Sequence, residues 1–343
     1  MKISFVTSAF GTVDGQRRFD MPSFVTECQA AEQAGFYAAY TGERRGRGPA
    51  SGQTAVTFNP DLLCMYGLAH TSSLVFGTHI TLLPLHHPVR VAQDATLVNA
   101  MFPGRYRLGL GAGYTTDDFR AFGVDLSERG RRMTEGLKAI NAYREGRNHE
   151  LAGGWQGVVP DRDPALGDDP LEIYLGAWSR PGVRRAARYG DGWYTGPIRT
   201  VAAEAELAQV YRDECAKVGK EPKVILMREA GLGVTDADAR AVHGDLLLEY
   251  ARIYWSRGGT YDPQWDPWVG RVEKAEDITL DMVMPDRFLC GSIDTWLDTI
   301  AGWKETIQPD EIILRLRYFY GPSLETAIRE MDLIGKHVIP ALA

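Results

Sequence analysis

Strand-like apolar segments alternate with helix-like segments along almost the whole chain, and this alternation restricts the fold more than any other feature. Eight segments have the pattern of strands, and nearly all are followed by a pattern typical of a helix. Several strands are apolar on both faces, which is expected of parallel strands that helices cover. The eight expected strands span residues 3–8, 36–41, 73–80, 106–110, 171–176, 191–195, 223–232 and 311–317.

The simplest closure of eight such strands is an α/β fold, the (β/α)8 TIM barrel. A bare barrel takes about 250 residues, so the 343-residue chain has room for insertions. We expect them after strands four and seven, at about 146–170 and 235–290. No repeat and no low-complexity linker is visible, so residues 1–343 are predicted to form a single domain. The alternative, a doubly wound open sheet, is disfavoured because no GxGxxG motif follows the first strand.

Individual residues indicate where several of the helices begin and end. Ser23 is expected to cap the first helix, and Gly35 is expected to stop it. Pro88 is expected to open a later helix, because its fixed φ suits a first helical turn. A further helix is predicted from Ser127 to about Arg144.

Composition excludes several classes of function. The net charge is -7 without any basic tract, which argues against nucleic-acid binding. No apolar run approaches the roughly 20 residues of a membrane span, and the first residues lack the apolar core of a signal peptide. The four cysteines lie far apart, as expected of reduced thiols in a cytoplasmic protein. His86 and His87 form the only histidine cluster, and no metal site is expected.

A glycine-rich segment marks the end of the fourth expected strand. Gly109, Gly111 and Gly113 alternate there and are followed by a polar loop. Glycines at the end of a strand let a flat ligand approach the bare backbone, and ligands of parallel α/β folds bind at that end. The segment lacks the final glycine of GxGxxG, so it indicates a cofactor site of another kind, which its surroundings suggest is a flavin site.

Five segments in order along the chain carry a resemblance to the bacterial luciferase-like superfamily of flavin-dependent oxidoreductases. They are AAEQAGFYAAYTGERR, SLVFGTHITLLPLHHPVRVAQDATLVNAMFPGRYRLGLGAG, PLEIYLGAWSRPGVRRAARYGDGWY, FLCGSIDTWLDTI and MDLIGKHVIPAL. Each is modest alone, but together they cover nearly the whole chain. The resemblance implies a TIM barrel that binds a flavin at the carboxyl ends of its strands.

The resemblance also implies positions for the cofactor. A cis peptide is expected between His79 and Ile80, where it would press the backbone against the flavin ring. The turn at residues 111–114 would lie along the edge of the ring, and residues 178–183 would bind the phosphate at a helix N-terminus. The expected cofactor-binding residues are Ser8, His79, Ile80, Gly111, Ala112, Gly113, Tyr114, Arg129, Arg132, Trp178, Ser179, Arg180, Gly182 and Val183. For Arg129 and Arg132, a solvated position at the start of a helix is an equal alternative.

Glu43, Arg44 and His79 are the expected catalytic residues. Glu43 and Arg44 follow the second strand, where the resemblance places an acid and a histidine. Arg44 departs from that pattern because it remains charged, so a histidine-based proton transfer at this position is in doubt. An anion-binding role for Arg44, a surface ion pair of Glu43 with Arg44, and simple packing of the His79 ring are the alternatives.

Aromatic residues are the expected substrate contacts. Trp193 and Tyr194 should face opposite sides of the sixth strand, with core packing as the alternative to a wall of the site. Residues 255–279 contain three tryptophans without a period, and we expect them to form a lid that excludes water. The lid tryptophans are Trp255, Trp265 and Trp268.

The resemblance implies one of two flavin chemistries. The preferred one is monooxygenation with O₂ and reduced FMN that a separate flavin reductase supplies. The alternative is hydride transfer with a 5-deazaflavin coenzyme, whose enzymes carry a histidine at the position of Arg44 and a glutamate at that of Tyr114. A flavin-binding protein without catalysis is the third hypothesis. A homodimer is expected, and the small-molecule substrate is not identified by the sequence.

Overall fold

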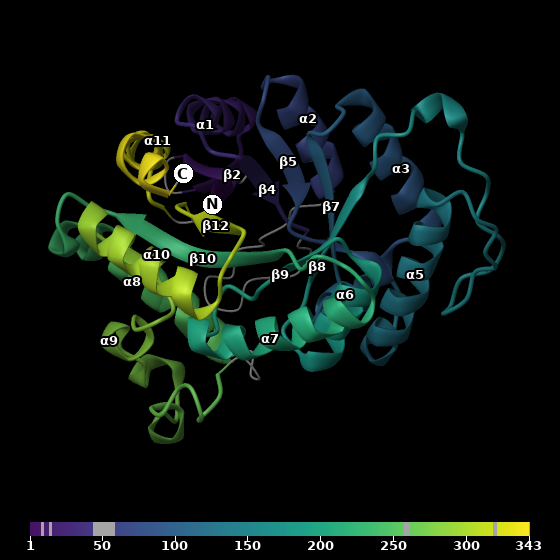
Figure 1. Ribbon diagram of the computed structural model, residues 1–343. Helices are drawn as coiled ribbons and strands as arrows, with labels where there is room; N and C mark the ends of the chain where they lie inside the picture. The colour runs from purple at the N-terminus through teal and green to yellow at the C-terminus, as the bar shows by residue number, and fades with distance from the viewer. Residues whose placement is uncertain (8–9, 14–15, 44–58, 257–260, 318–320, 343) are drawn as a thin grey trace. The chain divides into compact units, whose positions relative to one another are not determined.

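The computed structural model describes residues 1–7, 10–13, 16–43, 59–256, 261–317 and 321–342 (Figure 1). Two of the expected site residues, Ser8 and Arg44, lie outside the described residues. By its internal contacts the chain divides into two compact units. Unit 1 comprises Met1–Ala39, Thr195–Val210 and Lys223–Ala343, and unit 2 comprises Tyr40–Tyr194 and Tyr211–Pro222.

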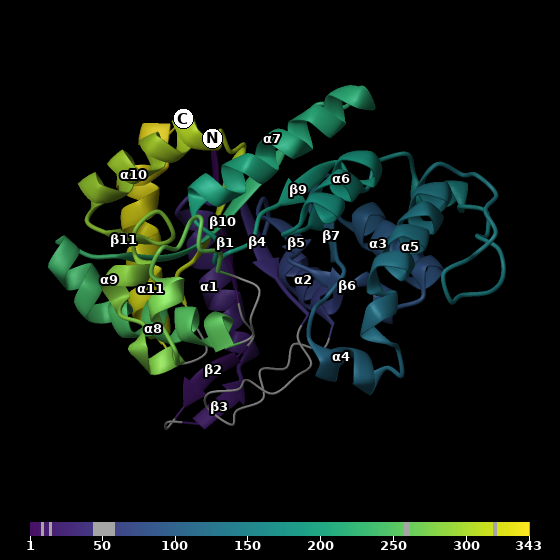
Figure 2. The ribbon, with the colours of Figure 1, turned by 90° about the horizontal axis from the view of Figure 1, so that it is seen from below.

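Unit 2 is built on parallel strands in the order β4-β5-β7-β8-β9, with short β6 paired to β7. Every residue of β7 is buried, as expected of a strand covered on both faces. Helices α3 and α5 pack against each other (Figures 1 and 2). The strands are β4 (Ala38–Thr41), β5 (Val75–Thr78), β6 (Thr81–Leu82), β7 (Tyr106–Gly111), β8 (Glu172–Gly176) and β9 (Gly192–Tyr194). The helices are α2 (Pro60–Ala69), α3 (Pro88–Met101), α4 (Thr116–Ala121), α5 (Arg129–Arg144) and α6 (Arg180–Tyr189).

Unit 1 contains parallel strands in the order β11-β10-β12-β1. It also contains an antiparallel hairpin, β2–β3, which contacts α1 (Figure 2). The strands are β1 (Lys2–Val6), β2 (Phe10–Val13), β3 (Gln16–Phe19), β10 (Val224–Leu232), β11 (Leu289–Gly291) and β12 (Glu311–Arg315). The helices are α1 (Met21–Gln33), α8 (Asp236–Ser256), α9 (Leu280–Val283), α10 (Ile293–Thr306) and α11 (Leu324–Leu333), while α7 (Val201–Lys217) has residues in both units.

All eight expected strands are present, as β1, β4, β5, β7, β8, β9, β10 and β12. They are parallel and helices separate them along the chain, so the fold class is the predicted (β/α)8 TIM barrel. The β2–β3 hairpin, β6 and β11 were not predicted. β6 and β11 span only two and three residues, which is too short to show a strand period.

The predicted helix boundaries are mostly confirmed, but the first N-cap is wrong. Asp20, not Ser23, caps α1: its Oδ1 accepts a hydrogen bond from the Ser23 backbone N–H at 3.1 Å. Pro22 lies in the first turn, so the helix begins earlier than its apolar pattern suggests. Gly35 has a φ of 82° after the end of α1, and α3 begins at Pro88, both as predicted.

The two predicted insertions differ in structure. Between α5 and β8, the regular structure is limited to a 3-10 turn, Pro164–Leu166, and isolated bridges. In the second region, α8 is 21 residues long. Trp255 therefore lies in the last turn of a helix, contrary to the irregular structure that we expected for it.

The four cysteines are free thiols, and Cys28, Cys64 and Cys215 are buried. Burial raises the pKa of Cys28 well above its usual value, and Glu27 adds to the effect. Burial also raises the pKa of the half-buried Cys290 to about 11. In the described part of the chain, no helix combines the length and the apolar character needed to cross a membrane.

A buried ionic cluster joins α7 to β10 inside unit 1. Glu204, in the first turn of α7, and Arg228, on β10, have no exposed surface. Arg199 Nε lies 3.7 Å from Glu204 Oε1, and Arg228 Nη1 donates to the carbonyl of Gly196 at 2.9 Å. Burial raises the pKa of Glu204 to about 7, although Arg228 and Arg199 oppose the shift.

This raised pKa predicts a stability that falls as the pH rises from about 4.5 to 7, because the unfolded state releases a proton that the folded state retains. Replacing Glu204 by glutamine should remove the fall, which amounts to up to about 3 kcal/mol. Urea denaturation of both proteins at a series of pH values measures it. Parallel curves for the variant and the native protein would contradict the prediction.

Candidate functional site

The connection between β5 and β6 lies against the end of β4. The His79–Ile80 peptide is cis, as predicted. The backbone N–H of His79 donates to the Thr41 carbonyl at 2.7 Å, and that of Glu43 donates to the Ile80 carbonyl at 2.9 Å. A Cβ on Gly42 would lie 2.5 Å from the His79 carbonyl oxygen. The absent side chain at residue 42 therefore permits the close contact that brings Glu43 to this edge of unit 2.

The glycines of β7 serve the same connection. A Cβ on Gly109 would lie 1.8 Å from the Thr78 carbonyl oxygen, and one on Gly111 would lie 1.7 Å from Ile80 Cδ1. A Cβ on Gly113 would lie 2.9 Å from a ring carbon of Phe119. Protein atoms thus occupy the direction in which a side chain at each of these three residues would point. The cofactor roles of Gly111, Ala112 and Gly113 stay predictions.

The turn before α6 presents an exposed helix N-terminus. Ser179 caps α6 by accepting a hydrogen bond from the Gly182 N–H at 3.4 Å, and both Ser179 and Arg180 are exposed. A Cβ on Gly182 would lie 2.9 Å from Ala177 Cβ, so glycine is needed for this tight turn. Val183 is buried beneath it. The partial positive charge of such a terminus and a hydroxyl beside it suit a phosphate.

An aromatic pair lies beside this turn. The ring centroids of Tyr114, after β7, and Trp178, after β8, are 5.3 Å apart. Tyr114 is 41% exposed, so its ring offers a flat apolar surface at the carboxyl end of the strands.

The two arginines of α5 named as cofactor-binding in the sequence analysis lie in different environments. Arg132 Nε donates to the Pro84 carbonyl at 2.7 Å, and its guanidinium carbon lies 4.3 Å from the centroid of the Trp155 ring. Arg129 is exposed at the start of the helix. Arg185, which the sequence analysis missed, donates from Nε to Thr134 Oγ1 at 2.9 Å, and burial lowers its pKa. A phosphate role for Arg129 and Arg132 stays a prediction.

Glu43 has a partner that the sequence analysis did not identify. Its side chain has no exposed surface. Oε2 accepts a hydrogen bond from the Leu82 backbone N–H at 2.7 Å, and His86 Nε2 lies 2.9 Å from both carboxylate oxygens. The His86 side chain is 26% exposed, and its ring meets the edge of Phe122. A 3-10 turn, Leu83–Leu85, directs His86 back to Glu43.

A second carboxylate lies near this pair. Tyr106 donates a short hydrogen bond to Asp61 Oδ1, and Thr81 Oγ1 lies 3.4 Å from Oδ2. Burial raises the pKa of Asp61, and the charge of Glu43 raises it further, while the bond from Tyr106 opposes the rise. Glu43, His86 and Asp61 together form a cluster able to hold and exchange protons.

Trp193 and Tyr194 have partners on different elements, as expected of neighbours on a strand. Tyr194 stacks on Tyr174 at 5.3 Å and meets the His79 ring at 4.8 Å. Trp193 Nε1 donates to the Ala177 carbonyl at 3.0 Å, and its ring lies 5.7 Å from Tyr211 on α7. Both residues have no exposed surface, and their role as substrate contacts stays a prediction.

In unit 1, the tryptophan-rich segment is held by one buried arginine. Arg287 donates a short hydrogen bond from Nη2 to Asp266 and another from Nε to the Ile198 carbonyl, and its guanidinium lies 5.0 Å from the Tyr261 ring centroid. Tyr261 in turn packs against Trp268, which is buried. Trp255 and Trp265 are half-buried. The lid role of this segment stays a prediction.

Within the described residues, no group of three or more histidine, cysteine, aspartate or glutamate side chains is placed to hold a metal ion.

Comparison with known proteins gives relatives of two chemical kinds. The chain is 26% identical over 291 residues to the 4-hydroxyprotoasukamycin monooxygenase of Streptomyces nodosus subsp. asukaensis, covering 80% of this chain and 74% of the relative. It is 28% identical over 248 residues to the F420-dependent hydroxymycolic acid dehydrogenase of Mycobacterium tuberculosis, covering 70% and 66%.

Solved structures show the same fold. The monooxygenase RslO1 from Streptomyces bottropensis matches with a TM-score of 0.81 at 20% identity, covering 100% of both chains. The oxygenating constituent of 3,6-diketocamphane monooxygenase from Pseudomonas putida, in complex with FMN, matches with a TM-score of 0.76 at 18% identity, covering 99% and 98%.

The family model described as luciferase-like monooxygenase matches residues 1–307. This match extends over most of the chain and contains four of the five sequence segments that carry the resemblance. The protein therefore belongs to the luciferase-like monooxygenase family.

Proposed function

We propose that the protein is a monooxygenase that uses reduced FMN, delivered by a separate flavin reductase, and O₂ to oxygenate a small organic substrate. The observation that carries the choice is Tyr114, whose exposed ring pairs with Trp178 where deazaflavin enzymes similar to this chain place a glutamate. The arginine at residue 44, in place of their histidine, points the same way.

The described residues fit a phosphate-bearing flavin. The exposed N-terminus of α6 carries the partial positive charge of a helix start, and Ser179 and Arg180 add a hydroxyl and a positive charge there. The neighbouring Tyr114–Trp178 pair offers an apolar surface for a flat ring. When bound, the flavin supplies the redox chemistry, and the protein supplies binding, orientation and exclusion of water.

Glu43 and His86 supply the proton chemistry in this proposal. Glu43 accepts a hydrogen bond from His86 Nε2, so that nitrogen holds its proton and Nδ1 is the atom available for exchange. The Leu82 N–H fixes the carboxylate from the other side. His86 thus provides an imidazole for proton transfer, which the permanently charged arginine at residue 44 cannot do.

Deazaflavin hydride transfer is the second candidate. It is favoured by the 28% identity to an F420-dependent dehydrogenase over 70% of the chain. The phosphate turn at α6 suits both coenzymes and does not separate them.

The two candidates differ in the coenzyme that is bound and in the use of oxygen. In the FMN proposal, the protein binds reduced FMN and slows its reoxidation by air, and a responsive substrate gains an oxygen atom from ¹⁸O₂. Stopped-flow absorbance and mass spectrometry of the products measure this. Tight binding of the deazaflavin coenzyme, with no binding of reduced FMN, would establish the second candidate instead.

Replacing Ser179 by alanine should weaken flavin binding by about 1–2 kcal/mol, because one bond to the phosphate is lost. The matched control is Ser323→Ala, since Ser323 caps α11 in the same way by accepting from the Thr326 N–H at 3.1 Å. Fluorescence titration of both variants measures the affinity. Equal flavin affinity for Ser179→Ala and the native protein would remove this phosphate assignment.

Replacing His86 by alanine should lower turnover by about 100-fold or more, as expected for the loss of an acid–base group, while flavin affinity changes little. The control is His87→Ala, because His87 is exposed and adjacent in the chain. Glu43→Gln should also lower turnover, because the carboxylate that orients the His86 ring is lost. Unchanged turnover in either variant would exclude the pair from proton transfer.

A further inference from the structure

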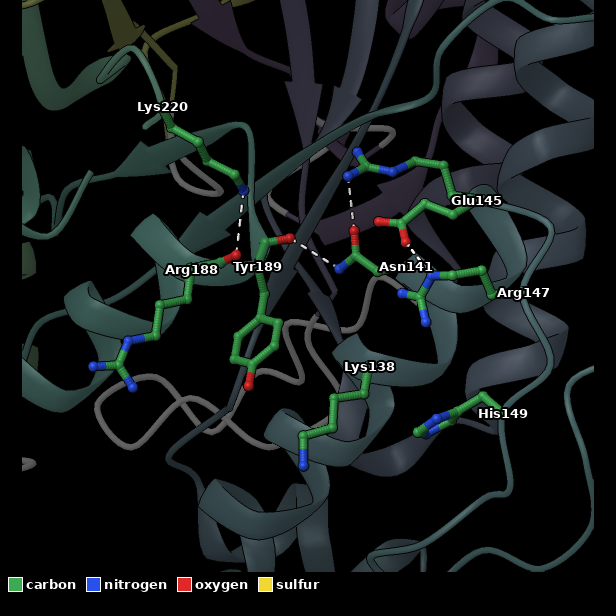
Figure 3. Close-up of a pocket in the computed structure, with 9 residues that line it drawn as sticks. Lys138, Asn141, Glu145, Arg147, His149, Arg188, Tyr189 and Lys220 are labelled. Atoms are coloured by element: carbon green, nitrogen blue, oxygen red, sulfur yellow. Dashed lines mark hydrogen bonds and ion pairs between the residues drawn. The ribbon is translucent and has the colours of Figure 1, made fainter. Parts of the chain in front are cut away.

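Unit 2 contains a basic pocket at the ends of α5 and α6 (Figure 3). Its volume is about 440 Å³. Helix α6 begins at the proposed phosphate turn and ends at the pocket ten residues later, a distance of about 15 Å along the helix. The pocket is therefore a separate feature from the flavin-phosphate turn, and the proposed function does not use it.

The side chains that line the pocket are strongly unbalanced in charge. Five are permanent cations and one is a carboxylate, a net charge of +4 in a chain whose total is -7. The cations are Lys138, Arg144, Arg147, Arg188 and Lys220, and the carboxylate is Glu145. Basic residues near a helix C-terminus are favoured by the helix dipole, but Lys138 lies two turns before the end of α5 and gains little from it.

Hydrogen bonds hold two of the cations, Arg144 and Lys220, in place at one side of the pocket. Arg144 Nη1 donates to Asp191 Oδ2 at 2.6 Å, and Nη2 donates to Asn141 Oδ1 at 2.7 Å. Lys220 Nζ donates to the carbonyls of Gly190 at 2.8 Å and Arg188 at 3.2 Å. Burial lowers the pKa of Lys220 and the charge of Arg144 adds to this, while the carboxylate of Asp191 opposes the shift.

Of the other three cations, Arg147 and Arg188 are exposed and Lys138 is half-buried, and each pairs with a carboxylate. Lys138 pairs with Glu135 at 2.8 Å, and Arg147 pairs with Glu145 at 2.5 Å. Arg188 lies 3.4 Å from Glu214, a carboxylate that it shares with Arg184 and Lys217. Exposed pairs of this kind contribute little to stability, so a bound oxyanion can replace the carboxylates at small cost.

One further lining residue has a polar atom that needs a partner. His149 Nε2 is shielded from solvent and has no hydrogen-bond partner among the described residues. The His149 ring lies at the edge of the pocket, across from the Tyr189 ring (Figure 3). Because this nitrogen is closed off from solvent, a ligand in the pocket meets other parts of the ring, and the cations remain the groups that would bind an anion.

We propose that this pocket binds a small molecule that carries a diphosphate group. Clustered phosphate oxygens match several converging cations, and arginine binds them with more than one hydrogen bond. The volume exceeds what a diphosphate alone fills and leaves room for an organic part beside Tyr189. The ligand class is therefore an organic diphosphate, such as a nucleoside diphosphate.

The test is isothermal titration of the full chain, without flavin, with inorganic pyrophosphate and with ADP in a buffer of low ionic strength. We expect both to bind with 1:1 stoichiometry and to bind more tightly than inorganic phosphate. The double variant Lys138→Gln with Arg147→Gln should weaken both by about tenfold or more. Glu145→Gln should tighten them by about twofold or more, because it removes the one lining carboxylate.

The matched control is the double variant Arg90→Gln with Arg131→Gln. Both arginines are exposed, each pairs with a neighbouring carboxylate, and neither lines the pocket. The two double variants change the net charge equally, so diffuse surface charge would weaken binding in both alike. Equal weakening would overturn the proposal, as would citrate binding as tightly as pyrophosphate or a failure of the native protein to bind pyrophosphate. The pocket variants should bind flavin as tightly as the native protein. Loss of pyrophosphate binding with flavin binding retained would separate this pocket from the proposed flavin site.

Discussion

The close approach of two backbones governs the candidate site. The carbonyl oxygens of Thr78 and His79 lie where Cβ atoms of Gly109 and Gly42 would otherwise be, and Ile80 fills the space beside Gly111. A side chain at Gly109 or Gly42 would overlap these atoms, and such overlap is strongly disfavoured. The two glycines therefore allow the connection between β5 and β6 to lie close to both β4 and β7. The positions of Glu43, Leu82 and His86 follow from it.

At this edge of unit 2, the residues proposed to bind the coenzyme differ from those proposed to transfer protons. The α6 turn and the Tyr114–Trp178 pair present exposed donors and apolar surface. The Glu43–His86 pair and Asp61 are instead buried or half-buried, and burial raises the pKa of Asp61. A coenzyme that carries the reactive centre needs few catalytic side chains.

Local patterns predicted the fold well and the site only partly. The eight strands depend on short-range signals and were predicted from them, whereas the cis peptide after His79 was expected from the family resemblance. The contact between Glu43 and His86 spans 43 residues of chain, and no local pattern reveals it. The same holds for Arg132, whose side chain is held by Pro84 and Trp155. The sequence indicated that the glycines of β7 permit a close approach to the backbone. Only the packing shows that Thr78 and Ile80 make that approach.

The raised pKa values of two cysteine thiols affect how readily those thiols are oxidised. A thiolate reacts with peroxide far faster than the protonated thiol does. Burial keeps Cys28 protonated and holds the pKa of Cys290 at about 11. In the proposed reaction with O₂, any turnover that does not oxygenate the substrate releases hydrogen peroxide near the protein. If the proposed oxygen chemistry holds, suppressed thiolate formation at Cys28 and Cys290 slows their oxidation by that peroxide.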